Sequence, residues 1–158
     1  MKVDLYSTVD KFLNQYVGGT NFYDALDEEI RINDAWLHAM IQKVLSSEVF
    51  DGFIVSGKFG NRFVDFYLSN YQPVKEVLVA NGALRKGNEI GIENKDLEGK
   101  KYIFLDDSFW SGKTRDVIKE FLNNNNGILL KSYVFYDGNK ERTNEVVSFY
   151  RYYDFHWW

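Results

Sequence analysis

The sequence predicts an α/β domain with a mainly parallel central sheet and flanking helices. Short, almost wholly apolar runs recur along the chain, and segments with a helical spacing of apolar residues alternate with them. Glycine-containing turns separate several of these segments. Strand–helix–strand repeats with nearly all-apolar strands are typical of a parallel sheet that is covered on both faces.

The first part of the chain, residues 1–49, predicts a helical appendage. Residues 8–17 space their apolar side chains as a helix does, and Gly18-Gly19 would end that helix. Asn33 or Asp34 can cap a second helix that extends to about residue 45. Its apolar face would consist of Trp36, Met40, Ile41, Val44 and Leu45.

Residues 50–136 predict the α/β core, and 137–158 a C-terminal strand or lid of the same single domain. The expected strands are 50–55, 75–79, 102–105, 128–136 and 146–153. The expected helices are 62–68 and 114–122, the second ended by an Asn run and Gly127. The turn SGKFGN at 56–61 follows the first strand, and the polar, glycine-rich stretch 81–101 predicts a loop or an irregular hairpin.

Composition narrows the classes of function. The net charge of −4 argues against wholesale nucleic-acid binding, and the absence of cysteine excludes disulfides and thiolate sites. Two histidines, His38 and His156, disfavour a multi-histidine metal site, and both are expected to be packing residues. No run of about 18 apolar residues predicts a membrane span, and the N-terminus is unlike a secretory signal. We therefore expect a cytoplasmic protein.

The stretch IFLDDSFWSGKT at 103–114 admits two interpretations. Its end, GKT, matches the close of a nucleotide-binding P-loop, but Asp107 stands where that motif has its first glycine. A carboxylate there would repel phosphates, and the tight turn would lose its glycine.

The second interpretation is a sugar-phosphate site. Asp106 and Asp107 would end a buried strand, Ser108, Phe109 and Trp110 would turn the chain, and Ser111–Thr114 would open a helix. Ligands of open α/β sheets bind at the carboxyl ends of strands, and helix N-termini bind phosphate. Acids that bind a diol, and help to hold Mg²⁺, beside amides that bind a phosphate suit ribose 5-phosphate.

YIFLDDSFWSGKT at 102–114 resembles the phosphoribosyl-pyrophosphate (PRPP) motif of type I phosphoribosyltransferases: four apolar residues, two acids, a short turn and [ST]-G-x-[ST]. The resemblance implies that Asp106 and Asp107 are catalytic acids that contact the ribose and the metal. It implies that Ser111, Gly112, Lys113 and Thr114 bind the 5-phosphate. Trp110 departs from the pattern, because 6-oxopurine enzymes of the family have an aspartate at that position. Its side chain is expected to form a wall of the pocket. The alternative is a buried strand followed by an ordinary capped helix, with the acids as turn residues.

Two further stretches fit the same resemblance. Gly57, Lys58 and Gly60 follow the first core strand, where the family binds pyrophosphate through backbone amides. Arg85 and Lys86, followed by Leu97–Lys100, stand where orotate and adenine enzymes have a basic pair and a short L-x-G-K. A plain turn after the strand and a solvated loop of mixed charge are the respective alternatives.

Two other clusters favour structural roles. The aromatic C-terminus, SFYRYYDFHWW at 148–158, can stack on a nucleobase, but packing of alternate aromatics on a last strand is favoured. The acids Asp24, Asp27, Glu28 and Glu29 predict a solvated cluster at a helix start.

The resemblance, strongest at 102–114, implies transfer of the phosphoribosyl group from PRPP to a nucleobase-like acceptor, with Mg²⁺. Two alternatives stay open: a non-catalytic PRPP- or nucleotide-binding regulatory or assembly subunit, and a P-loop-like NTP-binding protein. The expected partners are PRPP and the acceptor, with a homodimer or a larger assembly as further expectations, and neither nucleic acid nor a membrane is indicated.

Overall fold

The computed structural model describes residues 22–72, 75–80, 96–139, 141 and 143–151. The chain divides into two compact units, Met1–Glu48 and Val49–Trp158. The helix expected at 8–17 lies outside the described residues. Among the described residues, no helix has the length and apolarity that crossing a membrane requires.

The first unit contains helices α2 (Phe22–Ile32) and α3 (Ala35–Ser47). The expected cap is present at the start of α3, where the Asn33 Oδ1 accepts a hydrogen bond of 3.0 Å from the Ala35 N–H. The predicted face of α3 is buried except at Leu45, which is 39% exposed. His38 is buried as expected, and burial lowers its pKa.

The prediction of a solvated acidic cluster at a helix start is wrong for Glu29. Residues 27–29 lie in the middle of α2, and Glu29 is partly buried. Its Oε2 accepts a hydrogen bond of 2.9 Å from the indole Nε1–H of Trp36, which ties α2 to α3. The sequence did not reveal this pairing because the acid and its partner belong to different helices.

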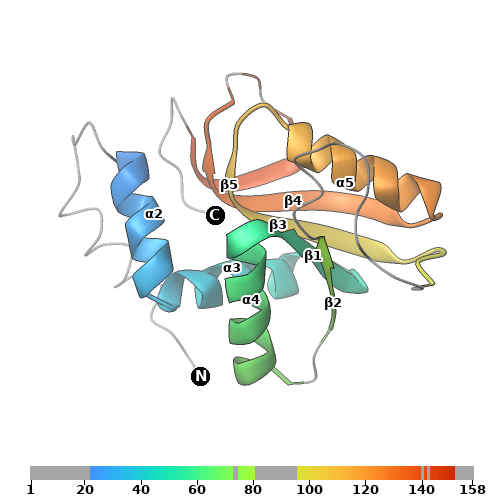
Figure 1. Cartoon of the computed structure of the whole chain (residues 1–158), viewed down its shortest axis with the longest axis horizontal. Helices are drawn as coiled ribbons and strands as arrows, with labels where there is room; N and C mark the ends of the chain where they lie inside the picture. The colour runs from blue at the N-terminus through green and yellow to red at the C-terminus, as the bar shows by residue number, and fades with distance from the viewer. Residues whose placement is uncertain (1–21, 73–74, 81–95, 140, 142, 152–158) are drawn as a thin grey trace. The chain divides into compact units, whose positions relative to one another are not determined.

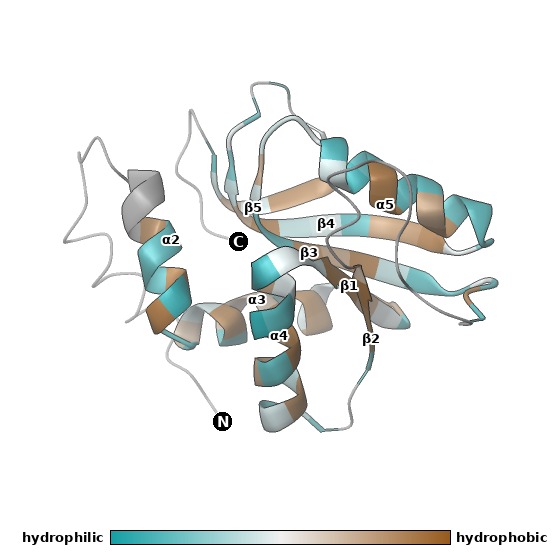
Figure 2. Cartoon of the chain, viewed as in Figure 1, coloured by the Kyte–Doolittle hydropathy of each residue, from teal (hydrophilic) through white to brown (hydrophobic). Residues whose placement is uncertain are grey.

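The second unit is built on a five-stranded sheet in the order β2-β1-β3-β4-β5, with every pair parallel (Figure 1). The strands are β1 (Gly52–Ser56), β2 (Glu76–Ala80), β3 (Lys101–Phe109), β4 (Ile128–Asp137) and β5 (Val146–Arg151). The predicted parallel sheet is thus confirmed. Figure 2 shows β1 and β2 as hydrophobic, as strands covered on both faces should be.

Helices α4 (Gly57–Asn70) and α5 (Lys113–Asn124) cover opposite faces of this sheet. Phe53 packs edge-on against Phe63 and Tyr67 of α4, at ring-centroid distances of 5.3 and 5.2 Å. The next residue, Ile54, shares a core cluster with Ile118 and Leu122 of α5. Because successive side chains of a strand point to opposite faces, the two helices lie on either side.

Two predicted turns are wrong in extent. The α4 helix begins at Gly57, so most of the stretch 56–61 is helical rather than a free turn. The β3 strand continues through Ser108 and Phe109, which pair with Tyr136 and Asp137 of β4. The two acids of the motif therefore lie inside the paired part of β3 and not beyond its end. The reason is that β4 is long enough to pair with β3 as far as Phe109.

Candidate functional site

A cavity of about 280 Å³ opens at the carboxyl end of β3. Its lining comes from the end of that strand and from the start of α5, including Asp106, Ser108, Trp110 and the SGKT segment, which we define as Ser111–Thr114. The structure thus brings Asp106 and the SGKT segment, which the sequence predicts to act together, to one cavity.

The two acids of the motif face different surroundings. Phe104, Asp106 and Ser108 alternate along β3 and line the cavity on the α5 side. Asp107 lies between them and is not among the residues that line the cavity, but its Oδ1 accepts a hydrogen bond of 3.3 Å from the Ser108 hydroxyl. The acids still contact each other, because the Asp107 N–H donates a hydrogen bond of 2.8 Å to Asp106 Oδ1. Asp106 is thus the acid that lines the cavity, and Asp107 is its direct neighbour.

Burial raises the pKa of Asp106 well above its usual range, and the negative charge of Asp107 and a side-chain hydrogen bond with Asp107 raise it further. The backbone N–H of Asp107 opposes this shift. A carboxyl group in such surroundings binds a proton or a cation readily, because either one relieves the buried charge and the repulsion. Hydroxyl donors or a metal ion in the cavity would favour its ionised form.

The SGKT segment forms the N-terminus of α5. Gly112 is the N-cap residue, with φ 81° and ψ 6°, a left-handed conformation that favours glycine. A Cβ at this position would lie 3.1 Å from the ring of Phe109, so a larger residue would also crowd the strand end. With glycine at the cap, no side chain of the cap residue bonds the first turn, and the positive end of the helix dipole faces this segment, a setting that favours an anion.

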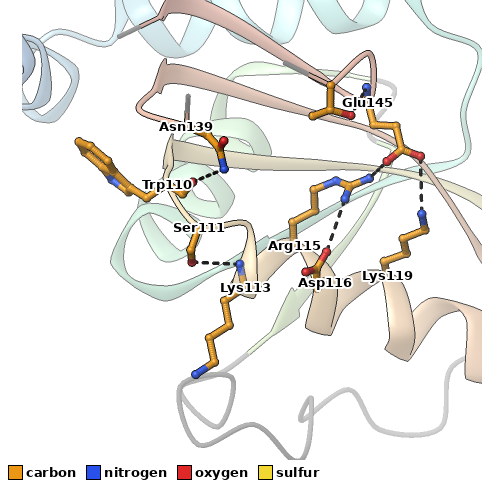
Figure 3. Close-up of polar contacts among 9 residues, drawn as sticks. Trp110, Ser111, Lys113, Arg115, Asp116, Lys119, Asn139 and Glu145 are labelled. Atoms are coloured by element: carbon orange, nitrogen blue, oxygen red, sulfur yellow. Dashed lines mark hydrogen bonds and ion pairs between the residues drawn. The ribbon is translucent and has the colours of Figure 1, made fainter. Parts of the chain in front are cut away.

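Within the segment, the Lys113 N–H donates a hydrogen bond of 3.3 Å to the Ser111 hydroxyl (Figure 3). The side chain of Lys113 extends away from the Arg115–Glu145 ion pair in the same view. Lys113 is exposed and is one of the residues that line the cavity, and it takes no part in that pair.

Trp110 forms part of the cavity wall and is 48% exposed. Its indole Nε1–H donates a hydrogen bond of 3.0 Å to the Ser108 hydroxyl, and its ring lies 5.1 Å from that of Tyr136 on β4. Tyr136 in turn stacks on Tyr150 of β5, with centroids 5.4 Å apart. Three aromatic rings from three adjacent segments thus form one aromatic row beside the cavity.

The predicted pyrophosphate residues fall into two groups. Gly57, Lys58 and Gly60 begin α4 at the carboxyl end of β1, so they share a sheet edge with Asp106. Arg85 and Lys86 lie outside the described residues, as do His156 and most of the aromatic C-terminus.

The short L-x-G-K stretch lies away from that edge. Leu97 is buried in the core beneath α5, and Lys100 pairs with Glu76 near the start of the strands, at 3.5 Å. In the described part of the C-terminus, Phe149 is fully buried, which agrees with the favoured packing role.

Sequence reasoning missed the residues after β4. Gly138, Asn139 and Glu145 contact the strand end or the start of α5, and the sequence shows them only as part of a polar connection. One signal was available, because Gly138-Asn139 directly follows an apolar strand of a parallel sheet, and the carboxyl ends of such strands gather at one edge.

The carboxylates near the cavity fit Mg²⁺ only in a site where the substrate and water supply the remaining ligands. In the described parts of the chain, no group of three or more His, Cys, Asp or Glu side chains is placed to hold a metal ion. Mg²⁺ commonly takes one or two carboxylates and completes its octahedron with water and substrate phosphates. Asp106 and Asp107 match that kind of site and do not match a cage made of protein ligands alone.

Comparison with known proteins supports the fold. No family model matches the sequence, and no curated protein matches it. Among solved structures, purine phosphoribosyltransferase from Pyrococcus horikoshii Ot3 aligns with a TM-score of 0.55 at 19% identity, covering 75% of this chain and 80% of that one. Adenine phosphoribosyltransferase from Thermoanaerobacter pseudethanolicus aligns with a TM-score of 0.55 at 14% identity, covering 78% and 83%.

The Helicobacter pylori xanthine-guanine-hypoxanthine phosphoribosyltransferase is also similar, with a TM-score of 0.52 at 16% identity and coverage of 73% of this chain and 82% of that one. At such identities the likeness defines architecture. The second unit has the type I phosphoribosyltransferase fold, a five-stranded parallel sheet with flanking helices.

Proposed function

We propose that the protein binds PRPP in the cavity at the end of β3 and transfers its phosphoribosyl group to a nucleobase-like acceptor. The observation that carries this proposal is the meeting of Asp106 with the SGKT segment in one cavity of about 280 Å³. An acid for hydroxyl groups and a helix N-terminus for a phosphate suit the two ends of a ribose 5-phosphate.

In this proposal each group has a separate task. Asp106 and Asp107 bind the ribose hydroxyls and would hold Mg²⁺. The amides of Ser111–Thr114 bind the 5-phosphate. Gly57, Lys58 and Gly60, at the neighbouring strand end, bind the pyrophosphate together with Arg85 and Lys86. When bound, Mg²⁺ supplies positive charge that offsets the charge of the pyrophosphate oxygens.

The reaction is the displacement of pyrophosphate by a nitrogen of the acceptor. Positive charge develops on the ribose as the bond to pyrophosphate lengthens, so catalysis rests on positioning and on charge stabilisation. The protein residues hold the ribose phosphate at both ends, and Trp110 limits the space on the side of the aromatic row.

A second candidate function is binding of PRPP without chemistry, as a regulator or an assembly subunit. The observation that favours it is Trp110, because a half-exposed indole in the cavity wall narrows the room for an acceptor. The P-loop alternative is less favoured, since Asp107 stands where that motif has its first glycine and belongs to strand β3, so the tight glycine turn of a P-loop is missing.

The test is a pair of measurements on the full chain. PRPP with Mg²⁺ is expected to raise the melting temperature, because a ligand that binds only the folded state stabilises it. Pyrophosphate release in the presence of a nucleobase panel then separates a transferase from a binder. A shift with ATP and none with millimolar PRPP would favour the P-loop alternative.

A variant of Trp110 separates the two roles of its ring. If the ring only walls the cavity, Trp110→Thr leaves PRPP binding measurable. If the ring occupies the ligand position, the wild-type protein binds PRPP poorly and the variant gains affinity.

A further inference from the structure

The connection between β4 and β5 contacts the strand end on one side of the SGKT segment. The Gly138 N–H donates a hydrogen bond of 2.7 Å to the Phe109 carbonyl. The Asn139 side-chain amide donates one of 2.6 Å to the Trp110 carbonyl (Figure 3). The Trp110 ring packs directly on Gly138, because a Cβ there would lie 2.2 Å from the ring and would force it to move. The two segments are therefore fitted closely to each other at this point.

The same connection contacts the chain again just after the SGKT segment. Arg115 lies in the first turn of α5, its side chain is only 10% exposed, and its guanidinium pairs with the Glu145 carboxylate (Figure 3). Asp116 lies 3.6 Å from the same guanidinium, and Lys119 lies 3.5 Å from the other Glu145 oxygen. Arg115 is the first residue after the SGKT segment and also lines the cavity, so its ion pair with Glu145 holds this end of the segment to the connection.

The connection is itself fixed to the sheet at both of its ends. At its start, Asp137 lies 3.4 Å from Arg151 of β5, both nearly buried, and the Arg151 guanidinium donates a hydrogen bond of 3.2 Å to the Asn139 carbonyl. At its end, the Ser132 N–H donates a hydrogen bond of 2.8 Å to the Glu145 carbonyl. The connection thus joins the SGKT segment to the rigid sheet.

We propose that Asn139 and Glu145 are positioning residues that hold the SGKT segment in the shape that binds a phosphate monoester. The segment has few bonds of its own, and its cap residue is a glycine, so an unheld segment would sample many conformations. The contacts of Asn139 with residue 110 and of Glu145 with residue 115 restrict the conformations of the SGKT segment before the ligand binds. Preorganisation of this kind strengthens binding. The identity of the anion as the 5-phosphate of a sugar rests on the proposed function.

The test compares Glu145→Gln and Asn139→Ala with Lys119→Gln. The Lys119 variant is the matched control, because it removes a partner of Glu145 and leaves the Arg115 contact intact. Amide hydrogen exchange of residues 111–116 reports the shape of the segment without any ligand. Titrations with ribose 5-phosphate and, separately, with inorganic pyrophosphate report binding at the two phosphate positions.

We expect Glu145→Gln and Asn139→Ala each to raise exchange in 111–116 about tenfold and to weaken ribose 5-phosphate binding about tenfold. Pyrophosphate affinity is expected to stay unchanged, a selectivity that general loss of stability would not produce. Lys119→Gln is expected to match the wild type in all three measurements. If Glu145→Gln fails to fold, Asn139→Ala carries the same comparison from the other side of the segment.

Unchanged exchange in both test variants would overturn the positioning role, as would an equal rise in the Lys119 variant. Equal weakening of both ligands would also overturn it. A wild-type protein that does not bind ribose 5-phosphate would remove the proposed function, whereas raised exchange confined to the two test variants would still support the positioning role.

Discussion

The two ends of the sheet both carry acids beside hydroxyl groups, yet they are organised in opposite ways. Near the starts of the strands, Glu76 accepts a hydrogen bond of 3.0 Å from the Tyr102 hydroxyl and lies 3.5 Å from the Lys100 ammonium. At the carboxyl ends, Asp106 has as its close neighbour a second acid, Asp107. One end pairs an acid with a cation, and the other places two like charges together.

This difference separates structure from function. A carboxylate with a cation and a hydroxyl donor is stabilised by its surroundings and adds to the stability of the fold. Two adjacent carboxylates beside a cavity repel each other and favour a cation or a proton, a cost that a ligand can relieve. We therefore expect the ligand to bind at the carboxyl ends of the strands. The amino ends of the strands, where the acid has a structural role, serve as the reference for comparison.

The largest expected effect comes from neutralising both acids of the carboxyl end. Asp106→Asn with Asp107→Asn keeps the shape and removes the charge, so we expect affinity for PRPP with Mg²⁺ to fall about 100-fold or more. Calorimetric titration measures this loss. The reference is Glu76→Gln at the amino end, which should leave PRPP affinity at the wild-type value. Equal loss in both variants would contradict the division between the two ends.

The next effect concerns the backbone of the SGKT segment. Gly112→Ala places a Cβ on a left-handed residue and 3.1 Å from the Phe109 ring, so it should cost about 1–2 kcal/mol of stability. Because relaxation of the segment misdirects its amides, we also expect about tenfold weaker binding of ribose 5-phosphate. Chemical denaturation and titration measure the two losses. Gly99→Ala is the control, since Gly99 also has a positive φ but its Cβ would meet nothing within 4 Å.

The sequence predicted the parallel sheet and the meeting of Asp106 with Ser111–Thr114, because both follow from local patterns. Apolar runs identify strands, and the carboxyl ends of parallel strands share an edge. The extension of β3 to Phe109 was not predictable, since it depends on pairing with β4 across the sheet. The contacts of Asn139 and Glu145 were missed for the same reason, because a polar connection does not show which distant residues it will meet.

A smaller effect is expected at the amino end. Tyr102→Phe removes the hydroxyl that donates to Glu76 and leaves that carboxylate with its Lys100 partner. We expect a loss of about 1 kcal/mol in the free energy of unfolding, the usual net value of such a hydrogen bond, with PRPP binding unchanged. Urea denaturation measures the loss. A stability equal to the wild type, or a change in PRPP affinity, would remove the amino end as a purely structural reference.

The smallest expected effect is a pH-dependent gain in stability at the carboxyl end. The pKa of Asp106 is raised in the folded protein, chiefly by burial and then by the charge of Asp107. A raised pKa means that the folded state binds the proton more tightly than the unfolded state does, so stability is greatest below the unfolded pKa and falls as pH rises through the folded one. Removing the titrating group should remove this fall.

Asp106→Asn should accordingly melt a few degrees above the wild type at pH 8 without ligand, and the gap should close only as pH falls below the ordinary pKa of an aspartate, toward about pH 3 and lower, where the wild-type carboxyl becomes protonated in both states. Asp107→Asn should give a smaller gain at pH 8, because it removes the second cause of the shift and leaves the burial of Asp106. Melting curves across this range measure both gaps. An Asp106→Asn protein that is less stable than the wild type at pH 8 would mean that this carboxylate is stabilised by its surroundings, as Glu76 is, and the contrast between the two ends of the sheet would be lost.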